Sequence, residues 1–404
     1  MGGRGVPRYT AACYTALYNQ AMENPFRYSG VVTGDLFVDR AEEIAALHQA
    51  FRAGEHMFLY SPRRYGKTSL ILEAFRRLPA TEKWVYVDLS RALSLQSMVE
   101  LLISAVLDGT ESPVERARRW GRTFLARLQP RLVLDSTGRI QVELGYSPRL
   151  TEPATLAEAL DLPQRAAEEL GVRLPVALDE FPVVHELGGD GLLRAMRAAF
   201  QMHDHVSYVF AGSETGMMEE LFAAERSPFF RIGRPLRLGA VPRDEFVPFL
   251  VAGFRNGGMD LPPHLAEKLC QVVDDHPYFV QTLAHELWAQ ARGGPITDQD
   301  LASALAAVVG WHDAYYRRLW ERLTLYQRRC LLALVELGAG ASLFAADTVA
   351  RFELKSPSHV QRALAALQRE GLAERRGGEY SLADPLFPHW AQAAGLVSGR
   401  GGLE

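Results

Sequence analysis

The feature that most constrains this chain is the segment 61–69, which reads Ser-Pro-Arg-Arg-Tyr-Gly-Lys-Thr-Ser. A short apolar run, 56–60, precedes it, and the residues 70–75 that follow have the apolar spacing of a helix. Strand, tight loop, Gly-Lys-Thr and helix occur in this order in phosphate-binding P-loops. The alternative is a chance Gly-Lys-Thr at the start of a helix, and the preceding strand argues against it. The segment therefore predicts an α/β fold that binds nucleotide phosphates.

Each part of this loop has a physical role. Backbone N–H groups of the loop and of the helix N-terminus converge on phosphate oxygens, and Gly66 lets the backbone approach them closely. Lys67 supplies a positive charge for the β- and γ-phosphates, and Thr68 offers a hydroxyl to Mg²⁺. Ser61 stands where the motif usually has its first glycine. Because serine adopts a positive φ less readily than glycine, we expect the start of the loop to differ slightly.

A second motif strengthens the prediction. Residues 174–181 read Leu-Pro-Val-Ala-Leu-Asp-Glu-Phe, which indicates a buried strand that ends in two carboxylates, a Walker B segment. Ligands of open α/β sheets bind at the carboxyl ends of the strands. We expect Asp179 to hold Mg²⁺ through its water shell and Glu180 to orient or deprotonate the attacking water. The alternative is an ordinary strand followed by an acidic turn.

Composition excludes several classes of protein. The 404 residues suggest two or three domains, and 48% hydrophobic with 23% charged residues describes a globular chain. A net charge of −4 excludes a strongly basic surface overall, so nucleic acid would need a local patch. Cys13, Cys270 and Cys330 are too far apart for a metal-ligand motif or a disulfide framework. With no apolar signal core and no bilayer-length apolar run, we expect a cytoplasmic protein without a membrane partner.

The order of patterns predicts four segments. An N-terminal segment covers 1–23, and an α/β core with a parallel sheet and helices on both faces covers 24–242. Residues 110–170 interrupt the core pattern as an insertion of unknown role. A helical lid domain follows at 243–314, and a winged-helix domain at 315–395.

Some finer expectations follow from local patterns. The insertion is predicted to contain a basic helix near 114–128 and a hairpin around 139–144. One long helix is expected at 298–323. His203 and His205 lack the flanking residues of a metal motif and are interpreted as a solvated helix end.

The last segment has the pattern of a winged helix. Three short helices are expected, and the third, at 359–370, begins after Ser-Pro-Ser at 356–358. A hairpin that contains Arg-Arg-Gly at 375–377 follows as the wing. Residues 315–380 contain 11 Lys and Arg against 7 Asp and Glu, a local excess of positive charge. The third helix is of the kind that enters a major groove of double-stranded DNA. The candidate DNA contacts are Ser358, Gln361, Arg362, Arg375 and Arg376. Winged helices also bind proteins or act as lids, so a protein partner is the alternative.

Several motifs between residues 24 and 390 together carry a resemblance to a known family. They are Asn24-Pro25-Phe26, Phe37-Val38-Asp39-Arg40, the P-loop itself, Asp179-Glu180-Phe181, Ala211-Gly212-Ser213, Ser227-Pro228-Phe229-Phe230, His276-Pro277-Tyr278 and Asp384-Pro385-Leu386-Phe387. With them the chain resembles the archaeal-type ATPases, a STAND/AAA+-like family of P-loop ATPases related to the origin-recognition ATPases. Ser61, and Asp39 where a glycine is usual, depart from the family pattern.

The resemblance implies a site for ATP and Mg²⁺. The implied ATP-binding residues are Pro25, Phe26, Val38, Arg40, Ser61, Pro62, Arg63, Arg64, Tyr65, Gly66, Lys67, Thr68, Ser69 and Pro277. Thr68 and Asp179 would hold the metal, and Lys67 and Glu180 would act in catalysis. Ser213 would sense the γ-phosphate. Arg231 and Arg234 are candidates for a finger that reaches the γ-phosphate of a neighbouring subunit in an ATP-dependent homo-oligomer; ordinary surface or lid contacts are the alternative.

The leading hypothesis is therefore an ATP-hydrolysing molecular switch, a slow ATPase, that couples nucleotide state to the winged helix. Two alternatives stay open. One is a nucleotide-gated DNA-binding regulator with little hydrolysis, and the other is an ATP-dependent assembly scaffold whose winged helix binds a protein.

Overall fold

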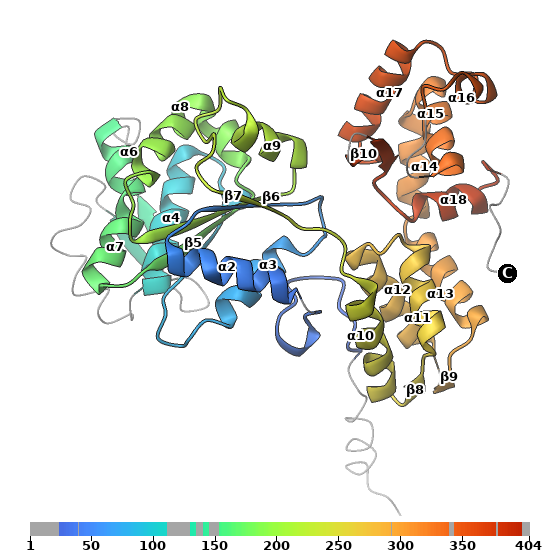
Figure 1. Ribbon diagram of the computed structural model, residues 1–404, viewed down its shortest axis with the longest axis horizontal. Helices are drawn as coiled ribbons and strands as arrows, with labels where there is room; N and C mark the ends of the chain where they lie inside the picture. The colour runs from blue at the N-terminus through green and yellow to red at the C-terminus, as the bar shows by residue number, and fades with distance from the viewer. Residues whose placement is uncertain are drawn as a thin grey trace, which may run out of the picture. The chain divides into compact units, whose positions relative to one another are not determined.

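The computed structural model describes residues 24–38, 40–110, 130–134, 140–144, 153–291, 293–338, 343–376 and 379–397. The chain divides into two compact units (Figure 1). Unit 2 is Val31–Ala240, and unit 1 combines Met1–Gly30 with Val241–Glu404. The chain therefore passes between the units twice, after Gly30 and after Ala240.

Unit 2 is built on a parallel sheet. Its strands are β1 (Met57–Tyr60), β2 (Val85–Asp88), β5 (Leu174–Asp179), β6 (Val206–Gly212) and β7 (Arg234–Arg237). Their order is β2-β5-β6-β1-β7, and every pairing between them is parallel. The predicted parallel α/β core is confirmed.

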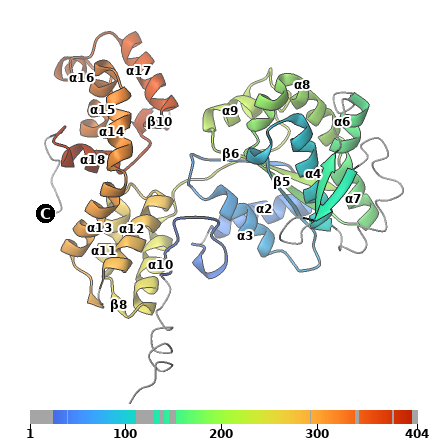
Figure 2. The ribbon, with the colours of Figure 1, turned by 180° about the vertical axis from the view of Figure 1, so that it is seen from behind.

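Helices cover both faces of this sheet. They are α2 (Ala41–Ala53), α3 (Lys67–Arg76), α4 (Leu95–Thr110), α6 (Pro153–Leu160), α7 (Leu162–Leu170), α8 (Val183–Phe200) and α9 (Thr215–Ala223), with short 3-10 turns at Gly34–Leu36 and Leu89–Arg91. Figures 1 and 2 show α2 and α3 on one side and α8 and α9 on the other. Side chains alternate accordingly: Tyr208 and Phe210 of β6 join one core cluster, and Val209 joins the other. A strand buried on both faces needs such a continuous apolar run.

The interrupted region contains an antiparallel hairpin of β3 (Pro130–Leu134) and β4 (Ile140–Leu144), which confirms the predicted hairpin. The helix predicted near 114–128 lies outside the described residues.

Unit 1 begins with a helical bundle. Its elements are α10 (Arg243–Asn256), α11 (Pro263–Val272), α12 (Pro277–Gln290), α13 (Asp298–Trp311) and α14 (Asp313–Arg322), with two-residue strands β8 (Met259–Asp260) and β9 (Gly294–Pro295). The expectation of one helix over 298–323 was wrong. The His312 amide bonds to the Val309 carbonyl three residues back, as at a helix end, and Gly310 just before weakens helix continuity.

The predicted winged helix is confirmed. It consists of α15 (Leu325–Leu337), α16 (Ala346–Arg351), α17 (Pro357–Arg369), the antiparallel wing strands β10 (Ala373–Arg376) and β11 (Glu379–Leu382), and α18 (Phe387–Ala393). Within unit 1, His389 Nε2 donates to the Val272 carbonyl at 2.7 Å and so ties α18 to the end of α11. In the part of the chain that the structure describes, no helix is long and apolar enough to cross a membrane.

Candidate nucleotide-binding site

The P-loop has the predicted strand–loop–helix geometry. It leaves β1 after Tyr60 and reaches α3 at Lys67. Gly66, at the helix N-cap, has a φ of 90°, a conformation that side chains disfavour, so glycine is needed here. Ser61 is not among the described residues with positive φ. Serine in place of the usual glycine therefore imposes no backbone strain at the start of this loop.

Lys67 is a buried cation held by carbonyl oxygens. Its side chain is buried, and Nζ donates to the Ser61 carbonyl at 3.0 Å and the Pro62 carbonyl at 3.3 Å. Burial lowers its pKa from the usual value. Among the described residues no carboxylate forms an ion pair with it. A buried ammonium whose hydrogen bonds go to neutral oxygens is matched to an anion such as phosphate.

Asp179 and Thr68 meet as the sequence predicts. Thr68 Oγ1 donates to Asp179 Oδ2 at 2.6 Å, and the carboxylate is buried at the carboxyl end of β5. Because the hydroxyl proton points to Asp179, the lone pairs of Thr68 stay available to a metal ion. Hydroxyl and carboxylate oxygens are ligands that Mg²⁺ prefers. The donor set therefore fits Mg²⁺.

Sequence reasoning missed a third member of this group, Tyr86 of β2. Its hydroxyl donates to the same Asp179 Oδ2 at 2.9 Å. Burial, together with the negative charge of Asp179, raises the pKa of Tyr86 above its usual range. The hydroxyl therefore stays protonated and donates.

Glu180 has an unusual backbone and a specific partner. Its φ is 53°, in the left-handed region that costs a non-glycine residue energy and that is concentrated at functional sites. Its Oε2 accepts a hydrogen bond from Ser213 Oγ at 2.9 Å. The predicted base and the predicted γ-phosphate sensor are thus in direct contact.

The remaining loop residues differ in exposure. Ser61 and Tyr65 are buried, Pro62 is half-buried, and Arg63 and Arg64 are exposed. Only the two arginines therefore present their side chains to solvent.

Helix α3 holds the segment that precedes α2. Ser69 Oγ accepts from the Val32 amide at 3.0 Å, and Glu73 Oε2 accepts from the Gly34 amide at 2.9 Å. The fully buried Glu73 carboxylate also accepts from Arg76 and Arg77. The hydrogen bond from Arg76 is the main cause that lowers the pKa of Glu73 to about 2. Ser69 therefore positions this segment from the first turn of α3.

Arg40, a predicted ATP contact, joins the two ends of unit 2. It lies in the left-handed region at the N-cap of α2, and its guanidinium is buried. Nη2 donates to the Gly239 carbonyl at 2.7 Å, and Nη1 contacts Glu43 at 3.0 Å. Neighbouring Val38 is half-buried. Arg40 thus fixes the backbone at Gly239, where the chain is about to leave unit 2.

Three predicted ATP contacts lie in unit 1. The Phe26 ring is fully buried, with its centroid 4.9 Å from that of Phe254. Pro25 is half-buried beside it, and Pro277 occupies the first turn of α12. The ring of Phe26 is therefore a core side chain of this unit.

The two finger candidates lie away from the P-loop of their own chain. Arg231 and Arg234 are exposed. Arg234 is in register with Met57 at the start of β1, whereas the P-loop follows the end of β1. Its Nη2 donates to the Ala46 carbonyl at 3.4 Å, and the Arg231 guanidinium lies 4.8 Å from the Phe230 ring. Neither arginine belongs to the group around Lys67 and Asp179.

The winged-helix candidates lie on a solvent-exposed surface. Ser358, Gln361 and Arg362 are exposed on α17, and Arg375 is exposed on β10, with its guanidinium 5.9 Å from the Tyr380 ring. The Arg376 side chain lies outside the described part of the chain.

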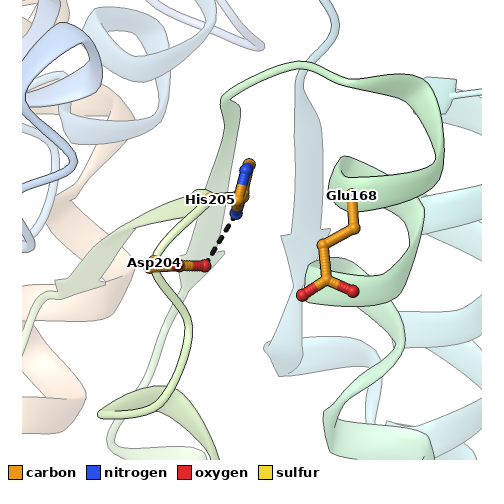
Figure 3. Close-up of side chains that lie close together, drawn as sticks. All are labelled: Glu168, Asp204 and His205. Carbon is orange, nitrogen blue, oxygen red and sulfur yellow. Dashed lines mark hydrogen bonds and ion pairs between the residues drawn. The ribbon is translucent and has the colours of Figure 1, made fainter.

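A polar cluster on α7 and before β6 resembles a metal site but is already satisfied. Glu168, Asp204 and His205 bring ligand atoms within 4.8 Å of one another (Figure 3). Gln164 Nε2 donates to Asp204 at 2.6 Å and to Glu168 at 2.7 Å, and so takes the position of a cation. The expectation that His203 is solvated was wrong: it is buried, and its Nδ1 lies 2.8 Å from the Tyr208 hydroxyl.

Comparisons with known proteins agree with this geometry. A family model described as a probable winged helix domain matches residues 314–393. A Walker-type ATPase of Pyrococcus abyssi is similar in structure, with a TM-score of 0.63 and 20% identity, over 91% of this chain and 99% of that one. The ORC2 protein of Aeropyrum pernix in its ADP form is similar with a TM-score of 0.52 and 15% identity, over 93% and 98%. No curated protein sequence matches significantly. The resemblance to archaeal Walker-type ATPases is thus confirmed for the fold, and the chain is a P-loop ATPase fold followed by a winged helix.

Proposed function

We propose that this protein is a molecular switch that binds and slowly hydrolyses ATP and couples its nucleotide state to DNA binding by the winged helix. The observation that carries the proposal is the contact between Thr68 and Asp179 at 2.6 Å, beside a buried Lys67 that forms no ion pair with any described carboxylate. Two motifs separated by 111 positions in sequence meet here as metal and phosphate chemistry requires.

Each residue has a distinct task in this proposal. Lys67 and the amides after Gly66 bind the phosphates. Thr68 and Asp179 hold Mg²⁺, which when bound neutralises charge on the phosphate oxygens. Glu180 orients the attacking water and accepts its proton once Ser213 turns toward the γ-phosphate. The products are ADP and phosphate.

One observation favours a second candidate, a nucleotide-gated regulator with little hydrolysis. Both the hydroxyl and the amide of Ser213 approach Glu180 Oε2, at 2.9 and 3.4 Å. While these contacts persist, that oxygen is a poorer proton acceptor. The two candidates differ in turnover and agree in nucleotide binding.

The charge on the winged helix favours DNA over a protein partner. Ion pairs with carboxylates engage four arginines of this part of the chain, Arg317, Arg322, Arg329 and Arg351. Within the described residues, Arg362 and Arg369 on α17 have no ion-pair partner and are exposed. They lie two helical turns apart on one face, with Ala365 between them. A small residue between two unpaired cations lets a helix approach a phosphate backbone closely.

We predict that replacing Arg362 and Arg369 with Ala weakens duplex binding and reduces the slope of log affinity against log salt by about 2, near one per lost phosphate contact. The measurement is titration of a labelled duplex at several salt concentrations, with ATP and with ADP. ATP affinity should not change, because both arginines lie outside unit 2.

The matched control replaces Arg329 and Arg351 with Ala, which removes the same charge from arginines already paired with Glu353 and Glu336. This control should change the slope of log affinity against log salt far less. Equal slopes for wild type and the Arg362/Arg369 variant would reject DNA contact and favour a protein partner. The contact of Arg376 and the finger role of Arg231 and Arg234 in an ATP-dependent oligomer stay predictions.

A further inference from the structure

Tyr86 occupies a place in the sheet that links it to the metal site. It lies on β2 in register with Ala177 of β5, two residues before Asp179. Ala177 packs in the core cluster under α3, and Tyr86 packs against the same cluster. Residues two apart on a strand share a face, so Tyr86, Asp179 and the start of α3 all meet on one side of the sheet.

Three hydrogen bonds orient the Asp179 carboxylate. Oδ2 accepts from Thr68 at 2.6 Å and from Tyr86 at 2.9 Å, and Oδ1 accepts from the Glu180 amide at 3.0 Å. The Tyr86 bond comes from a neighbouring strand, so the carboxylate is held from the sheet as well as from the first turn of α3. Side chains that orient metal ligands in this way strongly affect metal affinity.

We propose that Tyr86 is a positioning residue for Mg²⁺: its hydroxyl holds the Asp179 carboxylate in the orientation that receives the metal's water shell. The proposal rests on the proposed ATP and Mg²⁺ site. It assigns Tyr86 no contact with the nucleotide or with the attacking water.

The test is Tyr86→Phe, which keeps the ring that packs against the sheet and removes only the hydroxyl. Mg²⁺ is titrated against a fixed concentration of ATP and protein, and ATP binding is followed by calorimetry alongside turnover. We expect a roughly 10-fold rise in the Mg²⁺ concentration that gives half-maximal enhancement of ATP binding and half-maximal turnover. This is the scale of the effect when a side chain that hydrogen-bonds to a metal ligand is removed. ATP affinity without metal should stay as in wild type.

The matched control is Tyr316→Phe, which removes another tyrosine–aspartate hydrogen bond, to Asp384 at 2.8 Å, in unit 1. It should leave the Mg²⁺ dependence unchanged. If wild type responds to Mg²⁺ and Tyr86→Phe responds identically, the positioning role is rejected while the proposed site stands. If wild-type binding of ATP is indifferent to Mg²⁺, the proposed site itself fails.

Discussion

Replacing Lys67 with Ala is expected to lower ATP affinity by about 30- to 4,000-fold, because truncating one partner of a buried charge pair costs roughly 2–5 kcal/mol. Lys67 is the buried cation of the loop and donates there to neutral oxygens, the carbonyls of Ser61 and Pro62 and the Ser61 hydroxyl. The phosphates would therefore lose the buried cation of the P-loop. Calorimetric titration with ATP measures the effect.

Lys83→Ala is the matched control, since Lys83 is a half-buried lysine of the same unit that precedes β2 and lies outside the loop. Its ATP affinity should match that of wild type. The folded state of Lys67→Ala should be at least as stable as wild type in thermal unfolding, because a desolvated cation is removed. If ATP binds Lys67→Ala as tightly as wild type, the P-loop assignment is wrong.

Replacing Glu180 with Gln should keep ATP binding and slow hydrolysis by about 100- to 1,000-fold, within the range ascribed to a positioned general base. Glutamine has the same shape, and Ser213 Oγ can still donate to its carbonyl oxygen, so the local structure should persist. Single-turnover hydrolysis and equilibrium ATP binding separate the two effects.

Glu186→Gln, an exposed carboxylate in the first turn of α8, makes the same chemical change outside the site and should hydrolyse ATP at the wild-type rate. If Glu180→Gln hydrolyses ATP at the wild-type rate, Glu180 is not the general base. Turnover that is already negligible in wild type would favour the nucleotide-gated regulator.

Local motifs made the core of the site predictable. Gly66, Lys67 and Thr68 are consecutive, and Asp179 ends an apolar run, so sequence alone placed both at the carboxyl edge of a parallel sheet. The strand and helix alternation likewise predicted the sheet, and the turn residues near Pro357 and Gly377 predicted the winged helix.

Contacts that depend on strand order were not predictable. Tyr86 reaches Asp179 only because β2 lies beside β5, and nothing in the run around Tyr86 specifies that neighbour. His203 is buried because Tyr208 and Asp161 surround it, although its own flanks are polar. Glu73 did carry a signal, since Arg76 and Arg77 follow it at helical spacing. Its complete burial depends on the segment around Gly34, which no local pattern reveals.

The proposed switch requires that ATP hydrolysis in unit 2 and DNA binding by the winged helix are coupled. The most direct test is steady-state ATPase turnover of the full chain with and without saturating duplex DNA, paired with duplex affinity in ATP and in ADP. Binding linkage is reciprocal, so DNA that prefers the ATP state must also tighten ATP binding by the same factor. We expect measurable turnover that duplex DNA changes severalfold, and duplex affinity that differs between ATP and ADP. Turnover that is the same with and without DNA, together with equal duplex affinity in both nucleotides, would contradict the proposed coupling.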